Sequence, residues 1–295
     1  VAGSVFVWDV LSGRPWSTLT GGTGAVTSLA FSSDERTLVS GGADGAVRIW
    51  DVLSGSLVNT LTGHVNGTTT VSVTADGRTI VSGGFDKTVR VWDVQSGRCL
   101  NTLSGHTRKV NAVAVSPDGA TLASGADDNI ILLWDVASGR QIRSLRGHTL
   151  MVTALAFAPN GKVLASGGAD NSVRLWSVES GIETRSLTGH ADTVRSVAFS
   201  PDSAILVTAG EDRSVRIWDL ESGGSMGAVE GQTAWATSIA FGRDGRWMVW
   251  AGSDGTVSLW DIRLRSVLGK MVSMRNENWL VVSPTGLFDG SPEAW

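Results

Sequence analysis

The chain has 295 residues, long enough to bury roughly 75% of the surface that an unfolded chain exposes, and 24 Lys and Arg stand against 28 Asp and Glu, for a net charge of −4. With no basic block, this balance excludes the charge pattern of a nucleic-acid-binding surface, and no apolar run reaches the roughly 18 residues that span a bilayer. The single cysteine, Cys99, excludes an internal disulfide and fits a reducing compartment.

Two short apolar stretches open the chain, SVFVWDV at 4–10 and RPWSTLT at 14–20, and we expect both to be β-strands. From Trp8 onward a Trp recurs every 42 residues, and an Asp follows each of them except at Ser177. Trp-Asp pairs at a period of about 40–45 residues predict a propeller of repeated blades. The seven members of the series are Trp8, Trp50, Trp92, Trp134, Trp176, Trp218 and Trp260.

Within one period, 106–146, four strands are predicted from short apolar runs rich in β-branched residues. Turn sequences such as PDG at 117–119 and ASG at 137–139 separate the runs. Four antiparallel strands make one propeller blade. The predicted strands are KVNAVAVS (109–116), ATLASG (120–125), IILLWDV (130–136) and RQIRSLRG (140–147).

Further motifs recur with the same period. A Gly-His pair precedes the inner strands, at 63–64, 105–106, 147–148 and 189–190, and an Asp lies six residues before each Trp from Trp50 onward. With these motifs the chain resembles the WD-repeat propellers over essentially its whole length. The resemblance implies a buried tetrad in which Asp, His, Ser or Thr, and Trp are hydrogen-bonded in a line. The tetrads are His64, Ser82, Asp86 and Trp92; His106, Ser124, Asp128 and Trp134; His148, Ser166, Asp170 and Trp176; His190, Thr208, Asp212 and Trp218.

These tetrads have the composition of catalytic triads, but their repetition favours a structural role. A catalytic site is normally built once, whereas four copies at one spacing are typical of a device that every blade needs. The four histidines belong to four different blades, so they diverge around the ring instead of converging on a metal ion. We therefore expect no catalytic residues, no metal site and no cofactor.

The repeats predict an all-β, seven-bladed propeller that forms one domain over 1–295. The segment NWLVVSPTGLFDGS at 278–291 imitates an inner strand pair, with a small deletion. We expect a closing blade that takes its outer strands from 1–21 and its inner strands from 275–295, because such closure removes free sheet edges. The six other blades are expected at 22–63, 64–105, 106–147, 148–189, 190–231 and 232–274.

Functional residues are most often found at positions where a sequence departs from its repeat. Blade six departs most, with Gln232 at the His position, Trp250 at the Ser/Thr position and two additional tryptophans. We interpret Trp247 and Trp250 as an enlarged local core. Trp235 differs, because it belongs to the loop that enters an inner strand.

The loops that enter the inner strands share one face with the loops between second and third strands. Large apolar residues occupy four of these positions, which is typical of an interaction surface rather than of solvent-facing loops. Trp and Arg are also favoured as interface anchors. The predicted partner-binding residues are Phe85, Arg108, Asp127, Leu150, Met151 and Trp235.

Three functions can be considered for a chain with these features. The regular spacing leaves no room for long catalytic insertions, so we expect a non-catalytic scaffold that binds a protein or peptide, as a monomer in the cytoplasm. A propeller enzyme would need convergent acids, histidines or metal ligands on the inner strands, and Arg195 is the only charge there. The alternative is a sensor or regulatory domain of a larger bacterial enzyme such as a caspase-like peptidase. The tail NWLVVSPTGLFDGSPEAW resembles segments of such chains, and the chain begins at Val1, so we expect a piece of a longer protein.

Overall fold

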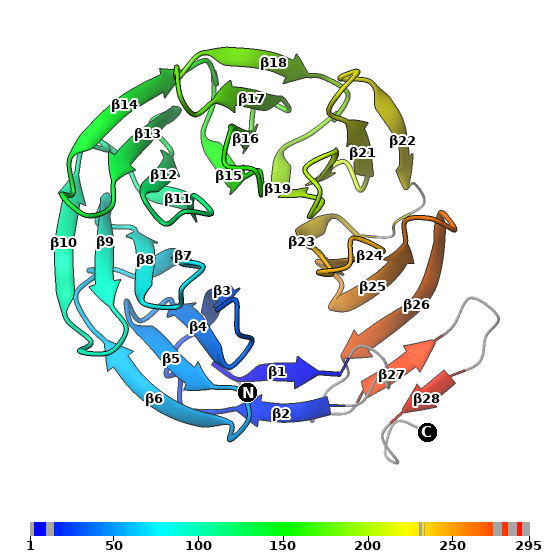
Figure 1. The fold of residues 1–295 in the computed structure, drawn as a ribbon. Helices are drawn as coiled ribbons and strands as arrows, with labels where there is room; N and C mark the ends of the chain where they lie inside the picture. Colours follow the sequence, from blue (N-terminus) through cyan, green and yellow to red (C-terminus); the bar gives the residue numbers. More distant parts are fainter. Residues whose placement is uncertain are drawn as a thin grey trace.

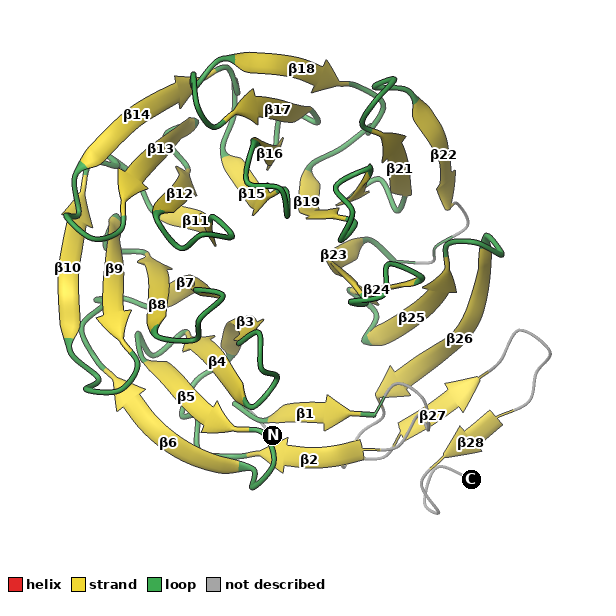
Figure 2. Cartoon of the chain, viewed as in Figure 1, coloured by secondary structure: helices red, strands yellow, loops and turns green. Residues whose placement is uncertain are grey.

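The computed structural model describes residues 3–9, 15–229, 232, 234–273, 279–282 and 288–290. All described elements are β-strands, and they form antiparallel sheets arranged as blades around a central axis (Figure 1). The first strand of each blade lies nearest the axis and the fourth lies at the outer edge of the ring (Figure 2). Across the described ranges, the chain has no helix that is long and apolar enough to cross a membrane.

The strands follow the repeat closely, with four per blade in blades one to five. Blades one to three contain β3 (Val26–Phe31), β4 (Thr37–Gly42), β5 (Val47–Asp51), β6 (Ser56–Leu61), β7 (Thr68–Val73), β8 (Thr79–Gly84), β9 (Thr88–Asp93), β10 (Cys99–Ser104), β11 (Val110–Val115), β12 (Thr121–Ala126), β13 (Ile130–Asp135) and β14 (Gln141–Arg146). Blades four and five contain β15 (Val152–Phe157), β16 (Val163–Gly168), β17 (Val173–Ser177), β18 (Glu183–Leu187), β19 (Val194–Phe199), β20 (Ile205–Gly210), β21 (Val215–Asp219) and β22 (Ser225–Val229).

Blade six and the two ends of the chain supply the remaining strands. Blade six begins with β23 (Ala236–Phe241), β24 (Trp247–Gly252), β25 (Thr256–Asp261) and β26 (Ser266–Ser273). The strands near the ends are β1 (Val5–Trp8), β2 (Pro15–Leu19), β27 (Trp279–Val282) and β28 (Phe288–Gly290).

Short-range polar contacts fix the turns between first and second strands. In blade three, Asp118 accepts hydrogen bonds from the Ser116 hydroxyl and the Ala120 backbone N–H, and Gly119 has φ of 72°. A carboxylate that binds nearby backbone groups stabilises a tight turn, and glycine adopts positive φ without a steric penalty. The PDG sequence therefore folds the chain back on itself at this point.

The prediction of a seven-bladed propeller is wrong, because the structure has six blades. The segment expected as the inner half of a closing blade joins blade six instead: β27 pairs with β26 and β28 pairs with β27. Blade six thus has six strands, while β1 and β2 form a two-stranded sheet of their own. In Figure 1, β27 and β28 lie outside β26, away from the axis. The other parts of the expected closing blade, at 1–2, 10–14, 275–278, 283–287 and 291–295, lie outside the described residues.

This difference has a physical reason. Strands pair through backbone N–H and C=O groups, so the similarity of 278–291 to an inner strand pair does not determine which strand edge the segment joins. The fourth strand of blade six, β26, has eight residues, whereas the fourth strands of the other blades have five or six. This long edge immediately precedes the tail in sequence, and the tail pairs with it.

The N-terminal sheet packs against blade one. Val5 of β1 and Leu19 of β2 are buried, and they form one apolar cluster with Leu38, Trp50 and Val52 of blade one. The sheet lies beside the middle and outer strands of blade one in Figure 1. It therefore covers the part of blade one that a neighbouring blade covers elsewhere in the ring.

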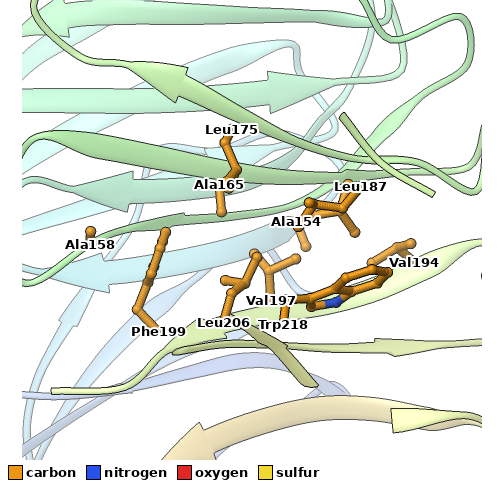
Figure 3. Packing of buried hydrophobic residues seen from close by; sticks show 11 residues of the cluster. Ala154, Ala158, Ala165, Leu175, Leu187, Val194, Val197, Phe199, Leu206 and Trp218 are labelled. Carbon is orange, nitrogen blue, oxygen red and sulfur yellow. The ribbon is translucent and has the colours of Figure 1, made fainter. Parts of the chain in front are cut away.

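Neighbouring blades are held together by apolar clusters between their faces. Figure 3 shows the cluster between blades four and five, in which Val194, Val197 and Trp218 of blade five pack with Ala154 and Leu187 of blade four. These residues are almost completely buried. Burial of apolar surface between blades is the main favourable contribution to such packing, at about 25 cal/mol per Å².

In blades one to four, a glycine on the second strand brings the blade close to the next. A Cβ added at Gly125 would lie 2.5 Å from Val152 Cγ1 of the following blade, and one at Gly167 would lie 2.6 Å from Val194 Cγ1. Between blades five and six the two positions are Ala209 and Ala236, which are both buried in one cluster. Ala209 has one methyl group more than the glycines of blades three and four, and Ala236 has two methyl groups fewer than the valines. The larger residue on one side of this junction is therefore offset by the smaller residue on the other side.

This compensation predicts a coupled pair of substitutions. We expect Gly125→Ala to lower the free energy of unfolding by about 1–3 kcal/mol, because the added methyl group overpacks the junction. Adding Val152→Ala should recover part of this loss, with a coupling energy of about 0.5–3 kcal/mol. Urea unfolding of the parent, both single variants and the double variant measures the coupling. Strictly additive effects of the two substitutions would contradict it.

Candidate functional site

Four of the described blades contain a line of buried hydrogen bonds. In blade two, Trp92 Nε1 donates to Ser82 Oγ at 2.8 Å, and His64 Nε2 lies 2.8 Å from the same oxygen. On the other side of the imidazole, Nδ1 lies 3.0 Å from Asp86 Oδ1. The structure thus brings together every residue of the four sequence-predicted tetrads. The other three lines join His106, Ser124, Asp128 and Trp134; His148, Ser166, Asp170 and Trp176; His190, Thr208, Asp212 and Trp218.

In blades two and five the hydrogen bonds fit a neutral imidazole. The hydroxyl accepts the indole N–H and donates its hydrogen to the imidazole Nε2, and the ring hydrogen on Nδ1 faces the carboxylate. Burial lowers the pKa of His64 and of His190 below the ordinary value, and it outweighs the opposing effect of the neighbouring Asp. Burial alone would raise the pKa of Asp170, but hydrogen bonds from His148 and Ser172 hold it well below its usual range.

The carboxylates also hold the loops of the predicted binding face. Asp170 Oδ2 accepts the backbone N–H of Thr149 at 2.9 Å, and the next two residues along the chain are Leu150 and Met151. The corresponding bond in blade three immediately precedes Arg108. A charge-assisted hydrogen bond therefore fixes the start of each of these loops.

In blade one an arginine replaces the histidine as the partner of the carboxylate, and the sequence analysis did not predict this exchange. Gly22 stands at the His position, and Arg48 donates to both oxygens of Asp44, with Nη2 to Oδ2 at 2.5 Å. Thr23 Oγ1 adds a hydrogen bond to the same carboxylate. The Arg48 guanidinium holds the pKa of Asp44 well below its usual range. The missing His together with an Arg two residues before Trp50 was the signal for this exchange.

Blade six lacks the tetrad. Trp250 occupies the position of the hydroxyl and is buried, and its ring centroid lies 6.3 Å from that of Trp260. Trp260 Nε1 and Ser258 Oγ are both buried without a hydrogen-bond partner among the described residues. The Trp247 ring lies under the guanidinium of Arg246, at 4.2 Å. Trp250 thus adds apolar volume to the core, but it leaves the neighbouring polar groups unsatisfied.

We use the name binding rim for the predicted partner-binding residues Phe85, Arg108, Asp127, Leu150, Met151 and Trp235. The four apolar members are 41% to 53% exposed. The structure does not bring all six into one cluster, because they stand on the loops of blades two, three, four and six. Trp235 lies two blades away from Leu150 and Met151 along the ring.

Polar residues connect part of the binding rim. Lys109 Nζ lies 5.3 Å from the centre of the Phe85 ring and 3.9 Å from Asp127 Oδ2. Asn111 Nδ2 donates to Asp127 Oδ1 at 2.8 Å and also to the Val152 carbonyl of the next blade. Asp127 is thereby fixed in place, and Phe85 has a cation beside its exposed face. Sequence reasoning placed Phe85 and Asp127 on this face but could not show that Lys109 joins them.

The inner strands enclose a channel of about 430 Å³. Thr27, Thr69 and Thr153 line it, and each hydroxyl donates to a carbonyl of its own blade and to one of the next blade. Arg195, the only ionic side chain among the described lining residues, forms an ion pair with Glu211. In the described part of the chain, no group of three or more His, Cys, Asp or Glu residues is placed to hold a metal ion. The channel thus offers hydroxyls engaged in holding blades together.

Comparison with known families gives one match, repeated six times along the chain. The family is described as WD domain, G-beta repeat, and its matches together cover well over half of the chain. No curated protein matches the chain. The matched segments are 13–51, 55–93, 97–135, 139–177, 181–219 and 223–261.

The buried histidines predict that acid destabilises the fold. A histidine with a lowered pKa stays neutral in the folded state while the unfolded state takes up a proton, so its contribution to stability is present above about pH 6.5 and is lost as the pH falls below that value. We expect the double variant His64→Gln/His190→Gln to lose less stability between pH 7 and pH 5 than the parent does. Glutamine is a suitable replacement because Gln232 stands at this position in blade six. Denaturant unfolding at both pH values tests this, and equally steep losses would contradict it.

Two fully buried serines should respond in opposite ways to loss of the hydroxyl. Ser82 has both tetrad partners, so Ser82→Ala should cost about 1–3 kcal/mol of the free energy of unfolding. Ser258 has no partner among the described residues, so Ser258→Ala should leave stability unchanged or raise it. Thermal and urea unfolding of the two variants provide the comparison. Equal destabilisation by both would show that Ser258 is hydrogen-bonded in solution.

Proposed function

Because this chain belongs to the WD-repeat family, whose propellers typically serve as non-catalytic scaffolds for protein interactions, we propose that its binding rim holds a protein or peptide partner. The observation that carries the proposal is the exposure of four large apolar side chains on one set of loops. Exposed apolar residues that recur on one face are characteristic of interaction surfaces.

The loops that present these residues are held in place before any partner arrives. The tetrad carboxylates bind the backbone just before Arg108 and just before Leu150. Residues that are already ordered lose little conformational entropy on binding. The rim thus combines apolar contact area with a preorganised backbone, which favours affinity for a partner.

The charges of the rim suggest how a partner is oriented. Arg108 is exposed, and Lys109 and Asp127 lie beside Phe85. Charged groups around an apolar contact mainly set specificity and the rate of association. We propose that Phe85, Leu150, Met151 and Trp235 supply the contact area, while Arg108 and Asp127 select the partner.

A second candidate function is a sensor or regulatory domain within a larger enzyme. The observation in its favour is the resemblance of the C-terminal sequence, 278–295, to segments of multidomain WD-repeat chains. In that case the binding rim would recognise a signal, and any catalysis would belong to other domains. Both functions use the same surface, so the experiment on the rim tests their common part.

The test needs a partner first, captured from the native host with the propeller as bait. Trp235→Ala and Met151→Asp should then each weaken binding by about 30-fold or more, equivalent to the roughly 2 kcal/mol of an interface hot spot. Ile182→Asp is the matched control, since Ile182 is 66% exposed in the turn between β17 and β18. Titration calorimetry gives the affinities, and the melting temperatures should stay close to the parent's. Normal binding by both rim variants, or unfolding of both, contradicts the assignment.

A further inference from the structure

Blade one exposes apolar side chains at two positions that are buried or partly buried in the inner strands of the other blades. Leu29 and Phe31 of β3 are 48% and 52% exposed, whereas Val71 and Val113, at the repeat position of Leu29, are 5% and 7% exposed. In blade two, Val71 packs on Val39, Val47 and Ile49 of the preceding blade. The difference at Leu29 therefore reflects a missing neighbour and not a different strand.

Blade six also exposes apolar residues, on the face that is turned toward blade one. Val257 of β25 is 38% exposed, whereas Val47, Val89 and Val215 at its repeat position are 0% exposed. Ser238 and Ala240 of β23 are exposed as well. Blades one and six thus form two walls of an open slot, and each wall consists of positions that are blade contacts elsewhere.

One wall also carries hydrogen-bonding groups that hold a neighbouring strand in the other blades. At three junctions a side-chain oxygen of one inner strand accepts a backbone N–H of the next: Ser28 from Val71, Thr70 from Val113, and Ser196 from Ile239. Ser238 is the corresponding residue of blade six. No backbone N–H in the described part of the chain occupies the corresponding place beside Ser238.

A threonine on the same strand repeats this pattern. Thr153 Oγ1 donates both to Gly167 of its own blade and to Val194 of the next. Thr237 Oγ1 donates to Ala251 of its own blade, at 3.2 Å. Ser238 and Thr237 therefore present an acceptor and a donor with the spacing that binds the inner strand of a following blade.

The N-terminal sheet fills only the outer part of this slot. Val5 and Leu19 pack on the middle of blade one, while Leu29 and Phe31, nearer the axis, remain exposed. A cavity of about 780 Å³ lies at the end of this slot, and its lining includes Val7, Trp16, Phe31 and Phe241. Leu29, Thr237 and Ser238 face the central channel, so the slot opens toward the axis.

We propose that the slot between blades six and one binds a β-hairpin supplied by another polypeptide. The hairpin lies on the axial side of β1, with one face against Leu29 and Phe31 and the other against Ala240 and Val257. Its first strand donates a backbone N–H to Ser238. Addition of a strand to an existing sheet is a general mode of peptide recognition, in which the backbone supplies hydrogen bonds and apolar pockets supply selectivity.

The occupant follows from continuity with the five existing blade junctions. Their inner pairs consist of two antiparallel strands of six residues with small or β-branched apolar side chains, as in β11 and β12. Among the described residues, an ion pair of 3.1 Å between Arg243 Nε and Glu35 Oε1 connects the two walls of the slot. Both side chains are about two-thirds exposed, and such surface pairs contribute little to stability, so an entering hairpin can displace this one.

A peptide with the sequence of residues 109–126, which spans β11, its turn and β12, is the probe. Labelled with a fluorophore, it should bind the full chain saturably in an anisotropy titration, and a scrambled peptide should not bind. Leu29→Asp and Val257→Asp, one on each wall, should each weaken binding at least tenfold. Ile182→Asp and Trp235→Ala are controls that should bind as the parent does, which separates the slot from the binding rim.

The outcomes are distinct. Hydrogen exchange should slow in β3 and β23 when the peptide is added, and circular dichroism should show that the wall variants remain folded. Absence of binding overturns the proposal, and so does binding that both wall variants leave unchanged. A dimer seen by sedimentation, and dissociated by Leu29→Asp, would also overturn it, because the slot would then hold a second copy of this chain.

Discussion

In blades two to five, a single buried hydroxyl joins the indole of the third strand to the imidazole of the entering loop, and the imidazole continues to a carboxylate in the next turn. Each group in this line satisfies the next, so a blade can bury four polar side chains without leaving a donor or an acceptor unpaired. The carboxylate then binds the backbone of the loop beyond it. Hydrogen bonds therefore connect the interior of the blade to the loops of the exposed face. A partner surface on these loops is held in place by the core.

Blades one and six show what happens when a member of this line changes. In blade one the Arg48 guanidinium reaches Asp44 directly, so the carboxylate keeps a buried partner although the imidazole is gone. In blade six Trp250 replaces the hydroxyl, and the indole of Trp260 loses its acceptor. The change in blade one thus keeps a hydrogen-bond partner for the carboxylate. The change in blade six adds apolar volume at the cost of a hydrogen bond. Both altered blades border the slot, where the ring lacks a complete neighbour.

The sequence predicted the parts of the structure that depend on local periodicity. The spacing of tryptophans located the strands of all six blades, and the repeated His, Ser or Thr, and Asp identified the groups that the structure brings within hydrogen-bonding distance. The pairing of the tail could not be predicted, because backbone groups of β27 are equally suited to any free strand edge. The role of Arg48 was missed because an arginine also stands two residues before Trp92, Trp176 and Trp218, in blades that keep the histidine. The binding rim was selected by residue type, and only the structure shows that Lys109 links Phe85 to Asp127.

The close pairs between blades bear on how such a ring can grow by duplication. Gly125 and Val152 belong to different blades and pack against each other, and Ala209 and Ala236 form a pair of another shape. If recombination copied blade four behind blade five, Val152 would meet Ala209, and if it copied blade six behind blade three, Ala236 would leave a void beside Gly125. A unit cut between the first and second strands carries each pair intact. The packing unit of this ring is therefore offset from the blade by one strand, because each of these contacts joins the second strand of one blade to the first strand of the next.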